Sequence, residues 1–481
     1  MDEYKTTWRE KLGYGIGAVG LDLSYGMFYS YLSYYLSSVL GLKEGFLLLL
    51  TPLARIWDGI NDPMMGTIVD RTRTKWGKCR PYLIIFPAII GVVTVLAFLN
   101  GNYATATSNT QKVLIVAWAA VSYIAWGMCF TVCDIPLWGI TSLMTEDEDD
   151  RSKLLGLARI VAGIGGVGVL VVQIAQVVAE IFVNKGYSQA KASQYGFILT
   201  VIIMTVIATV LFEFAGIGTR ERVEQAEKKY TFTENFKIMF QNKPFRQILI
   251  SGILRSPIQL LMLIAMTLIT YYYANGDFMN VLQTGANGKP AGLNWSILVR
   301  LAVIAAAVFL GQFIAMGITP ALIRKHEKKS VYNFYSVAGA VPFALLYVFF
   351  KIAHGDVKTS MVWVVLTGLC FFFAGAAMGG INVLQSVMIA DCVDYEEYHN
   401  GVRTDGVFFS GQSFITKLSG GIASILSAVV YHFVGYSDAN ILKLNEALKN
   451  GADFLSYDGG SGAGKYAATM FFLISIPPAI G

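Results

Sequence analysis

One segment decides the class of this protein: residues 46–69 read FLLLLTPLARIWDGINDPMMGTIV. The segment is long and apolar enough to cross a bilayer as a helix, which takes about 20 residues, yet Arg55, Asp58 and Asp62 lie near its centre. At about 100° per helical residue, Asp58 and Asp62 are about 40° apart, and Arg55 is about 20° from Asp62. Ionisable groups at membrane depth are costly, so this shared face is predicted to meet a water-filled path or a charged partner.

The composition indicates a polytopic membrane protein. Of 481 residues, 55% are hydrophobic and only 14% are charged, with a mean hydropathy of +0.54. Soluble proteins have about a quarter of their residues charged. The net charge of +5 is small and resides in loops. From the hydrophobic composition we expect a lipid bilayer as partner, and we expect no nucleic acid.

The five cysteines predict neither disulfides nor a metal site. All fall in predicted spans or cytoplasmic loops, where disulfides are rare. Cys129 and Cys133 share a helix face, but no histidine lies near them in the sequence to complete a zinc site, so they are read as packing residues.

Apolar stretches predict twelve membrane spans. Their approximate ranges are 13–40, 44–69, 81–99, 112–141, 154–183, 195–217, 247–273, 295–321, 331–353, 360–390, 405–436 and 464–481. The apolar part of the last range has only about 15 residues, so we expect this span to be truncated or irregular.

Lysine and arginine in the loops predict the orientation. Residues 70–80, 220–246 and 324–329 are basic, whereas 100–110 and 275–294 carry almost no basic residues. The basic loops are therefore expected on the cytoplasmic side, and twelve spans then place both termini in the cytoplasm.

The chain is predicted to form two six-helix bundles, residues 1–218 and 247–481, joined by a cytoplasmic loop at 219–246. Each half has a basic loop after its second span and an acidic cluster after its fourth, at 146–150 and 391–397. Such a parallel repeat is typical of transporters that bind their substrate between the halves near mid-membrane.

Several polar side chains interrupt the predicted helices. Gly15–Gly20 matches a nucleotide-binding glycine pattern, but no strand precedes it, so it is read as helix packing. Asp22 follows, either to accept sugar hydroxyls or to form a structural salt bridge. On the fourth span, Asp134 and Trp138 share a face that fits a pyranose, with an ion-paired Asp beside an interfacial Trp as the alternative.

The deep charges do not balance. The aspartates Asp22, Asp58, Asp62 and Asp134 stand against the cations Arg55, Arg159 and Lys417. A net negative cluster in low dielectric needs a proton or a metal cation. The pair Asp58 and Asp62, with oxygens from Asn61 and Thr131 nearby, is therefore a candidate monovalent-cation site.

At these residues the chain resembles the glycoside–pentoside–hexuronide:cation symporters, the melibiose-carrier family of the major facilitator superfamily. The resemblance covers essentially all twelve predicted spans and rests on residues 11–22, 55–63, 70–78, 134–138 and 390–397. It departs at Leu21 and Phe130, where the melibiose carrier has lysine and tyrosine, and at Asn382 and Gln385, which replace an obvious second aromatic. The departures leave open which glycoside, pentoside or uronide is carried.

The resemblance implies a role for each matching residue. The cation site comprises Asp58, Asp62, Asn61 and Thr131. The sugar site comprises Asp22, Asp134, Trp138, Arg159 and Lys417, with the lysine linking the two sites. The cytoplasmic gate comprises Gly66, Asp70, Arg71 and Arg73.

We therefore expect an all-α protein of the bacterial inner membrane that moves a sugar with a cation by alternating access. No cofactor is expected beyond the coupling ion, which is Na⁺, H⁺ or Li⁺. Two alternatives remain: a membrane sensor that binds sugar without moving it, and a membrane enzyme that uses the carboxylates on a lipid-linked sugar.

Overall fold

The computed structural model describes residues 5–42, 44–165, 171–223, 231–273, 282–284, 290–293, 295–401, 404–436, 438–449, 451–458 and 465–481. Within the described residues, each of the twelve predicted spans contains one helix or several consecutive helices. The prediction of an all-helical membrane protein is confirmed. A small antiparallel pair, β1 (Leu282–Thr284) and β2 (Pro290–Leu293), lies in a predicted loop.

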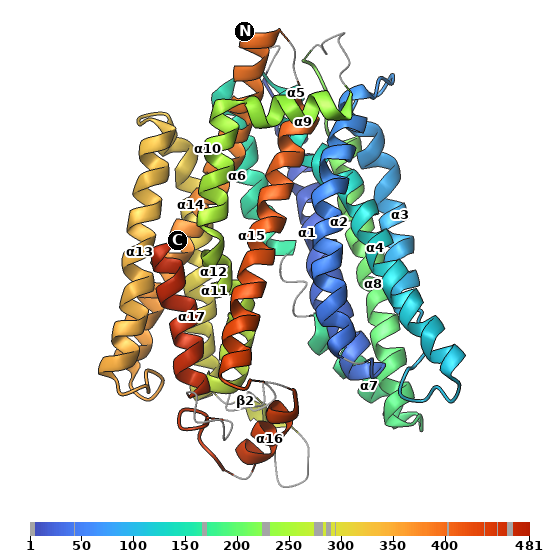
Figure 1. The fold of residues 1–481 in the computed structure, drawn as a ribbon, viewed down its shortest axis with the longest axis vertical. Coiled ribbons are helices and arrows are strands. Elements are labelled where there is room, and N and C mark those ends of the chain that lie inside the picture. Colours follow the sequence, from blue (N-terminus) through green and yellow to red (C-terminus); the bar gives the residue numbers. More distant parts are fainter. Residues whose placement is uncertain are drawn as a thin grey trace. The chain divides into compact units, whose positions relative to one another are not determined.

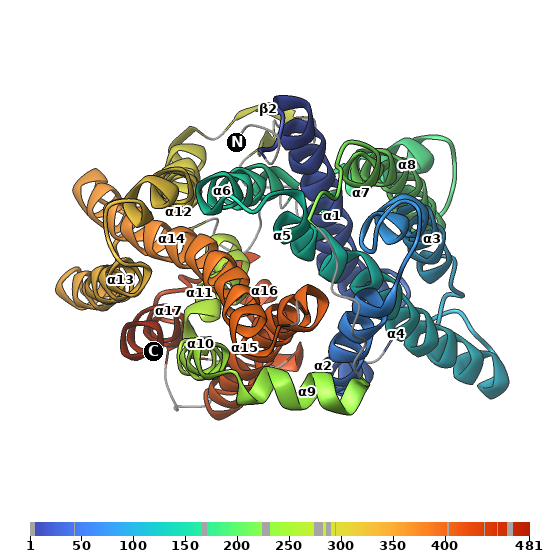
Figure 2. The same ribbon diagram turned by 90° about the horizontal axis from the view of Figure 1, so that it is seen from above.

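The chain divides into two compact units, the first of which contains residues 1–248 and 385–417. The helices wholly within it are α1 (Trp8–Tyr34), α2 (Glu44–Arg71), α3 (Arg80–Phe98), α4 (Asn109–Gly139), α5 (Thr141–Met144), α6 (Glu148–Gly165), α7 (Val171–Asn184), α8 (Gln189–Ile217) and α9 (Phe232–Gln241). Three further helices are divided between the two units. A short π-helix, Tyr35–Val39, extends α1. Helix α1 packs beside α6 and α8, and α3 beside α4 and α8 (Figures 1 and 2).

The second unit contains residues 249–384 and 418–481. Its elements, including those shared with the first unit, are α10 (Lys243–Leu254), a 3₁₀ turn (Ser256–Gln259), α11 (Leu260–Thr267), a π-helix (Leu268–Tyr273), α12 (Trp295–Ile323), α13 (Lys328–Ile352), α14 (Met361–Asn400), α15 (Asp405–Phe433), α16 (Asp438–Lys449) and α17 (Tyr466–Ile480). Helices α13 and α17 lie side by side (Figure 1). The predicted boundary near residue 246 lies close to the one at 248, but 385–417 groups with the first unit, so the two-bundle division stays a prediction.

Among the described residues, seven helices are long and apolar enough to cross a membrane, and α10 with the helical segment after it, bent by 52°, makes an eighth. Helix α2 is long enough, but Arg55, Asp58 and Asp62 place three charges near its centre. Helix α17 is continuous over 15 residues with Pro477 and Pro478 inside it, so the described part of the last span is short, as the sequence predicts.

The glycines of α1 serve close helix packing, as predicted. A Cβ atom added at Gly17 would lie 2.3 Å from the Cβ of Ala215 on α8, and one at Gly20 would lie 2.3 Å from the backbone nitrogen of Phe212. Only residues without a side chain allow two helices to approach this closely.

The start of α1 is fixed by a capping box and a distant arginine. The Thr7 hydroxyl accepts a hydrogen bond from the Glu10 backbone, and Glu10 accepts from the Thr7 backbone at 2.8 Å. The guanidinium of Arg222, beyond α8, donates to both carboxylate oxygens of Glu10 at 2.7 and 2.9 Å. Burial raises the pKa of Glu10, but the hydrogen bonds from Thr7 and the charge of Arg222 outweigh it, so the pKa lies below its ordinary value.

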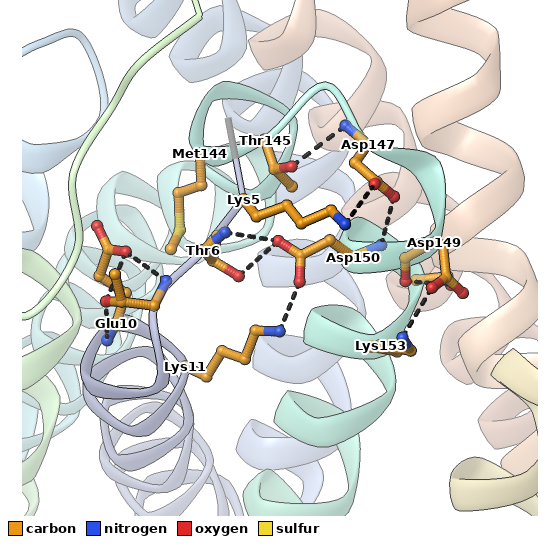
Figure 3. Close-up of polar contacts among 12 residues, drawn as sticks. Lys5, Thr6, Glu10, Lys11, Met144, Thr145, Asp147, Asp149, Asp150 and Lys153 are labelled. Atoms are coloured by element: carbon orange, nitrogen blue, oxygen red, sulfur yellow. Dashed lines mark hydrogen bonds and ion pairs between the residues drawn. The ribbon is translucent and has the colours of Figure 1, made fainter. Parts of the chain in front are cut away.

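Asp150, at the start of α6, ties down the segment before α1 (Figure 3). It accepts from the backbone and the hydroxyl of Thr6, at 2.7 and 2.6 Å, and from the ammonium of Lys11 at 2.5 Å. Burial raises the pKa of Asp150, but these hydrogen bonds lower it by more, so the carboxylate stays charged below its usual range. We call this group of residues the amino-terminal clasp.

The two predicted acidic clusters meet through an arginine. Arg151, next to Asp150 in the first cluster, donates to Asp394 in the second at 2.7 Å and lies 3.8 Å from Asp391. Arg151 is buried, so two carboxylates from α14 neutralise a cation that water does not reach.

Candidate functional site

The acids of α2 meet a threonine and a lysine from two other helices. The ammonium of Lys417 on α15 donates to Asp62 at 2.7 Å and to the Thr131 hydroxyl of α4 at 3.1 Å. Thr131 in turn donates to the same Asp62 oxygen at 2.9 Å, and Lys417 lies 3.7 Å from Asp58. Three helices therefore converge on one cluster, which we call the α2 acid cluster.

The α2 acid cluster is buried. Asp62 is 0% exposed, Asp58 3% and Lys417 8%, so little water screens these groups. Among the described side chains, two carboxylates lie close to the ammonium of Lys417, and buried carboxylates are stabilised by a nearby cation. The side chain of Arg55 lies outside the described residues. Among the described residues, Asp62 Oδ2 and Asn61 Nδ2 are buried without a hydrogen-bond partner. Within the described part of the chain, Asp62 Oδ2 therefore has no hydrogen-bond donor and could accept a cation.

The described part of the chain holds no group of three or more histidine, cysteine or acidic side chains placed to bind a metal. The α2 acid cluster has only two carboxylates, and a hydroxyl supplies further oxygen. Such a set suits a weakly held monovalent ion or a proton better than a divalent metal, which takes six or more oxygens in the case of Ca²⁺.

A second cluster lies one helical turn away along α4, around Trp138. Asp134 accepts from the indole of Trp138 at 2.9 Å and from the hydroxyl of Ser413 on α15 at 3.0 Å. The guanidinium of Arg159 on α6 lies over the Trp138 ring, 3.6 Å from its centroid. We call this group the Trp138 cluster.

Arg159 also forms a hydrogen bond with α14. Its Nη2 donates to the hydroxyl of Ser386 at 3.1 Å, and the Gln412 amide of α15 donates to the same hydroxyl at 2.8 Å. Ser386 is fully buried and Gln412 is 5% exposed. This contact brings three helices together beside the indole.

Asp22 approaches the Trp138 cluster from α1. It interacts electrostatically with Arg159 and Asp134. The close approach of α1 to α6 depends on Gly165, because a Cβ atom there would lie 3.0 Å from the Cβ of Asp22 and 2.4 Å from the Val19 carbonyl oxygen. Asp22, Asp134, Trp138 and Arg159 thus lie together, and Lys417 contacts the α2 acid cluster while it also interacts electrostatically with Asp134. The roles of these residues stay predictions.

The two clusters are joined by the helices that build them. Helix α4 supplies Thr131 to the first and Asp134 to the second, and α15 supplies Lys417 to the first and Ser413 to the second. Each pair is about one helical turn apart, so a shift of either helix moves a contact in both clusters.

The predicted gate residue Asp70 caps the start of α15. Its two oxygens accept from the backbone nitrogens of Gly406 and Val407, both at 2.9 Å. Lys78 bridges Asp70 and Asp405 at 2.8 and 2.9 Å. Burial lowers the pKa of Lys78, but the charges of Asp405 and Asp70 outweigh this and raise the pKa above its ordinary value.

The other predicted gate residues have different positions. Gly66 permits the approach of α2 to α15, since a Cβ atom there would lie 2.5 Å from the Gly406 carbonyl oxygen. Arg73 donates to the backbone oxygens of Asp70 and Thr72 at 2.7 and 2.9 Å, so it shapes its own turn. Arg71, the last residue of α2, is exposed.

Sequence reasoning missed several residues of these clusters. Asp405 accepts from Ser142 at 2.5 Å as well as from Lys78, yet it is 327 residues from Lys78 in the sequence. Lys78 lies in the basic segment already singled out, and Asp405 is an acid in the first turn of a predicted span, which were the available signals. Ser386, Gln412 and Ser413 gave no signal, because small polar residues are common in membrane helices.

Comparison with known proteins places these features in context. The model of the family described as MFS/sugar transport protein matches residues 13–450. An isoprimeverose transporter of Lactiplantibacillus pentosus is 25% identical over 89% of this chain and 81% of its own length. The inner membrane symporter YicJ of Escherichia coli strain K12 is 26% identical over 90% of this chain and 84% of its own. A glucuronide carrier protein homolog of the same strain is 24% identical over 89% and 84%.

Solved structures share the fold. FucP, a major facilitator superfamily transporter in the outward conformation, has a TM-score of 0.55 at 12% identity, covering 98% of this chain and 97% of its own. The proton:xylose symporter XylE has a TM-score of 0.50 at 13% identity, covering 92% and 93%. The predicted major facilitator fold of a multi-pass membrane protein is thereby confirmed.

Proposed function

The chain belongs to the MFS/sugar transport protein family, a family of membrane transporters and not of enzymes, and on this premise we propose that it moves a sugar together with a cation. The sugar is a glycoside, a pentoside or a hexuronide, and the cation is Na⁺, H⁺ or Li⁺. The protein would act in the inner membrane of a bacterium, with both termini in the cytoplasm.

The observation that carries this proposal is the contact of Lys417 with Asp62 and Asp58. A cation that binds these carboxylates competes with Lys417 for them and weakens their hold on it. Movement of Lys417 shifts Ser413, one turn away on α15, and so changes the contact that Asp134 makes. Asp134 and Asp22 are then available to accept hydroxyls of the sugar, with Trp138 beside them.

Coupling follows from this shared dependence. A ligand changes a conformational equilibrium only if it binds one state better than the other. Here the cation and the sugar each favour the arrangement that the other needs, so their binding is mutually reinforcing. Only the doubly loaded and the empty carrier would then change between outward and inward access.

Uptake into right-side-out vesicles tests the proposal. The panel is isoprimeverose, raffinose, lactose, melibiose and a methyl glucuronide, each with and without Na⁺ at two pH values. We expect at least one sugar to accumulate against its gradient in an ion-dependent way. A protein that binds a panel sugar in detergent but shows neither uptake nor counterflow would be a sensor, and the transport proposal would be wrong.

The variant Asp58→Cys tests the role of the cation. Removing this carboxylate leaves Asp62 paired with Lys417 and removes one of the two proposed ligands of the cation. We expect concentrative uptake to be lost while sugar exchange is partly kept. If this variant still accumulates sugar against a gradient, the assignment of Asp58 to the coupling ion is wrong.

A further inference from the structure

We propose that Ser386 holds Arg159 over the face of Trp138 in the sugar-free protein, so that a sugar must displace this guanidinium to stack on the indole. Ser386 is then a positioning residue that sets sugar affinity through Arg159. The inference rests on the proposed function and concerns how the Trp138 cluster is occupied before sugar arrives.

Arg159 lies in direct contact with the ring of Trp138. The guanidinium carbon of Arg159 lies 3.6 Å from the centroid of the Trp138 ring, which is van der Waals contact. No pyranose fits between two groups at this separation. The face that Arg159 covers is therefore closed to a sugar until the arginine moves.

Ser386 holds the guanidinium of Arg159 in this position. The Ser386 hydroxyl accepts from Arg159 at 3.1 Å and from Gln412 at 2.8 Å, and a hydroxyl oxygen has two lone pairs to accept with. Ser386 and Gln412 are both buried, so the acceptor is held in one place. A hydrogen bond from a charged donor to such an acceptor is stronger than one between neutral groups.

The hydrogen bonds of Arg159 in this position are incomplete. Among the described residues, its buried Nε has no hydrogen-bond partner, so the guanidinium is only partly satisfied in this position. A sugar hydroxyl or carboxylate would offer it new acceptors. The hydrogen bond to Ser386 therefore opposes movement of Arg159 away from Trp138, whereas binding of a sugar favours that movement.

Replacing Ser386 shifts this balance in a defined direction. In Ser386→Ala the parked arginine loses its acceptor, whereas the displaced arginine loses nothing. The sugar-free arrangement is therefore weakened relative to the sugar-bound one, and we expect sugar to bind about three to ten times more tightly. Ser386→Thr keeps the hydroxyl and should behave as the unaltered protein.

A first experiment needs no sugar. Phenylglyoxal reacts with accessible guanidinium groups, and mass spectrometry of the purified full chain reports the rate at Arg159. We expect labelling to be several times faster in Ser386→Ala and unchanged in Ser386→Thr, with Arg71, exposed at the end of α2, as internal reference. Equal rates at Arg159 in all three proteins would overturn the proposal, whether or not a transported sugar is known.

A second experiment measures binding of isoprimeverose, raffinose, lactose, melibiose and a methyl glucuronide by calorimetry. Tighter binding in Ser386→Ala, with normal affinity in Ser386→Thr, supports the proposal. Weaker or unchanged binding in Ser386→Ala overturns it while the proposed transport function stands. If the unaltered protein binds none of these sugars, the proposed function loses its support. The labelling rates alone then test whether Ser386 holds Arg159 over Trp138.

Discussion

The α2 acid cluster and the Trp138 cluster share two helices but are held together differently. The first is closed by an ion pair, Lys417 with Asp62 at 2.7 Å. The second is closed by hydroxyl and indole donors on Asp134 and by a guanidinium on an aromatic ring. A charge is displaced from its partner most readily by another charge, whereas a hydroxyl contact is exchanged for a hydroxyl of a ligand. The difference suits one cluster to an ion and the other to a sugar.

The largest effect that would test this comparison is expected for Lys417→Met. Removing the ammonium leaves Asp58 and Asp62 buried without their cation, and breaking a buried pair in this way costs about 3–5 kcal/mol. A bound ion should restore much of that loss, because it stabilises only the folded state. Thermal unfolding in detergent, measured against Na⁺, Li⁺ and pH, should therefore show a strong ion dependence.

Lys78→Met is the matched control for Lys417→Met. It removes an equally buried lysine that bridges Asp70 and Asp405 but whose acids also have backbone or hydroxyl donors. We expect a comparable loss of stability without ion-dependent recovery. If Lys417→Met gains no more from ions than Lys78→Met, the α2 acid cluster does not bind the coupling ion.

Trp138→Ala should have the next largest effect, confined to the other cluster. The variant removes the aromatic face and a donor to Asp134, so sugar affinity should fall by about tenfold. The ion dependence of stability should be unchanged. Trp118→Ala on the same helix, where the indole is partly exposed and donates to the Leu96 backbone, is the control that should bind normally.

Ser413→Ala tests whether the two clusters communicate through α15. Asp134 loses one donor, which is worth about 1 kcal/mol, so sugar affinity should change by about fivefold. Because Ser413 is one turn from Lys417, ion affinity measured in the presence of sugar should change by a similar factor. Ser413→Thr should restore both values, and a change in sugar affinity alone would contradict the coupling route through α15.

The smallest effect is expected outside both clusters, at the amino-terminal clasp. The pKa of Asp150 in the folded protein lies below its ordinary value, so its contribution to stability is complete above about pH 4 and is lost as the pH falls through the lowered pKa. Asp150→Asn should cost about 1 kcal/mol at neutral pH and less at about pH 3. Unfolding measured at both pH values checks this, and sugar and ion affinities should not change.

The sequence anticipated the parts of these clusters that lie on single helices. Helical periodicity is enough to place Asp58 beside Asp62, and Asp134 beside Trp138. It cannot tell which distant helix supplies the partner. Lys417 is 355 residues from Asp62, and periodicity alone does not show which aspartate it contacts. The resemblance gave Lys417 the role of linking the two sites. In the structure Lys417 contacts Asp62 and Asp58 and interacts electrostatically with Asp134, and its role stays a prediction.

The fold shows the same division. Hydropathy predicted the spans because exclusion of water from the backbone leaves few alternatives to helices in a bilayer. It did not predict α9 and α16, which lie in polar connections, nor the strands β1 and β2. Grouping of residues 385–417 with the first unit depends on contacts such as that of Arg151 with Asp394, which no local pattern records.

The capping of α15 by Asp70 has a consequence for how fast this end of the protein can open. Any movement of α15 away from α2 frees the amides of Gly406 and Val407 together with the Asp70 carboxylate, and all must find water at once. If this end of the protein opens in the proposed transport cycle, the step requires hydration of these groups, and its rate should fall as osmolytes lower the activity of water. The rate of the proposed transport cycle would then depend on the activity of water as well as on the ion and the sugar.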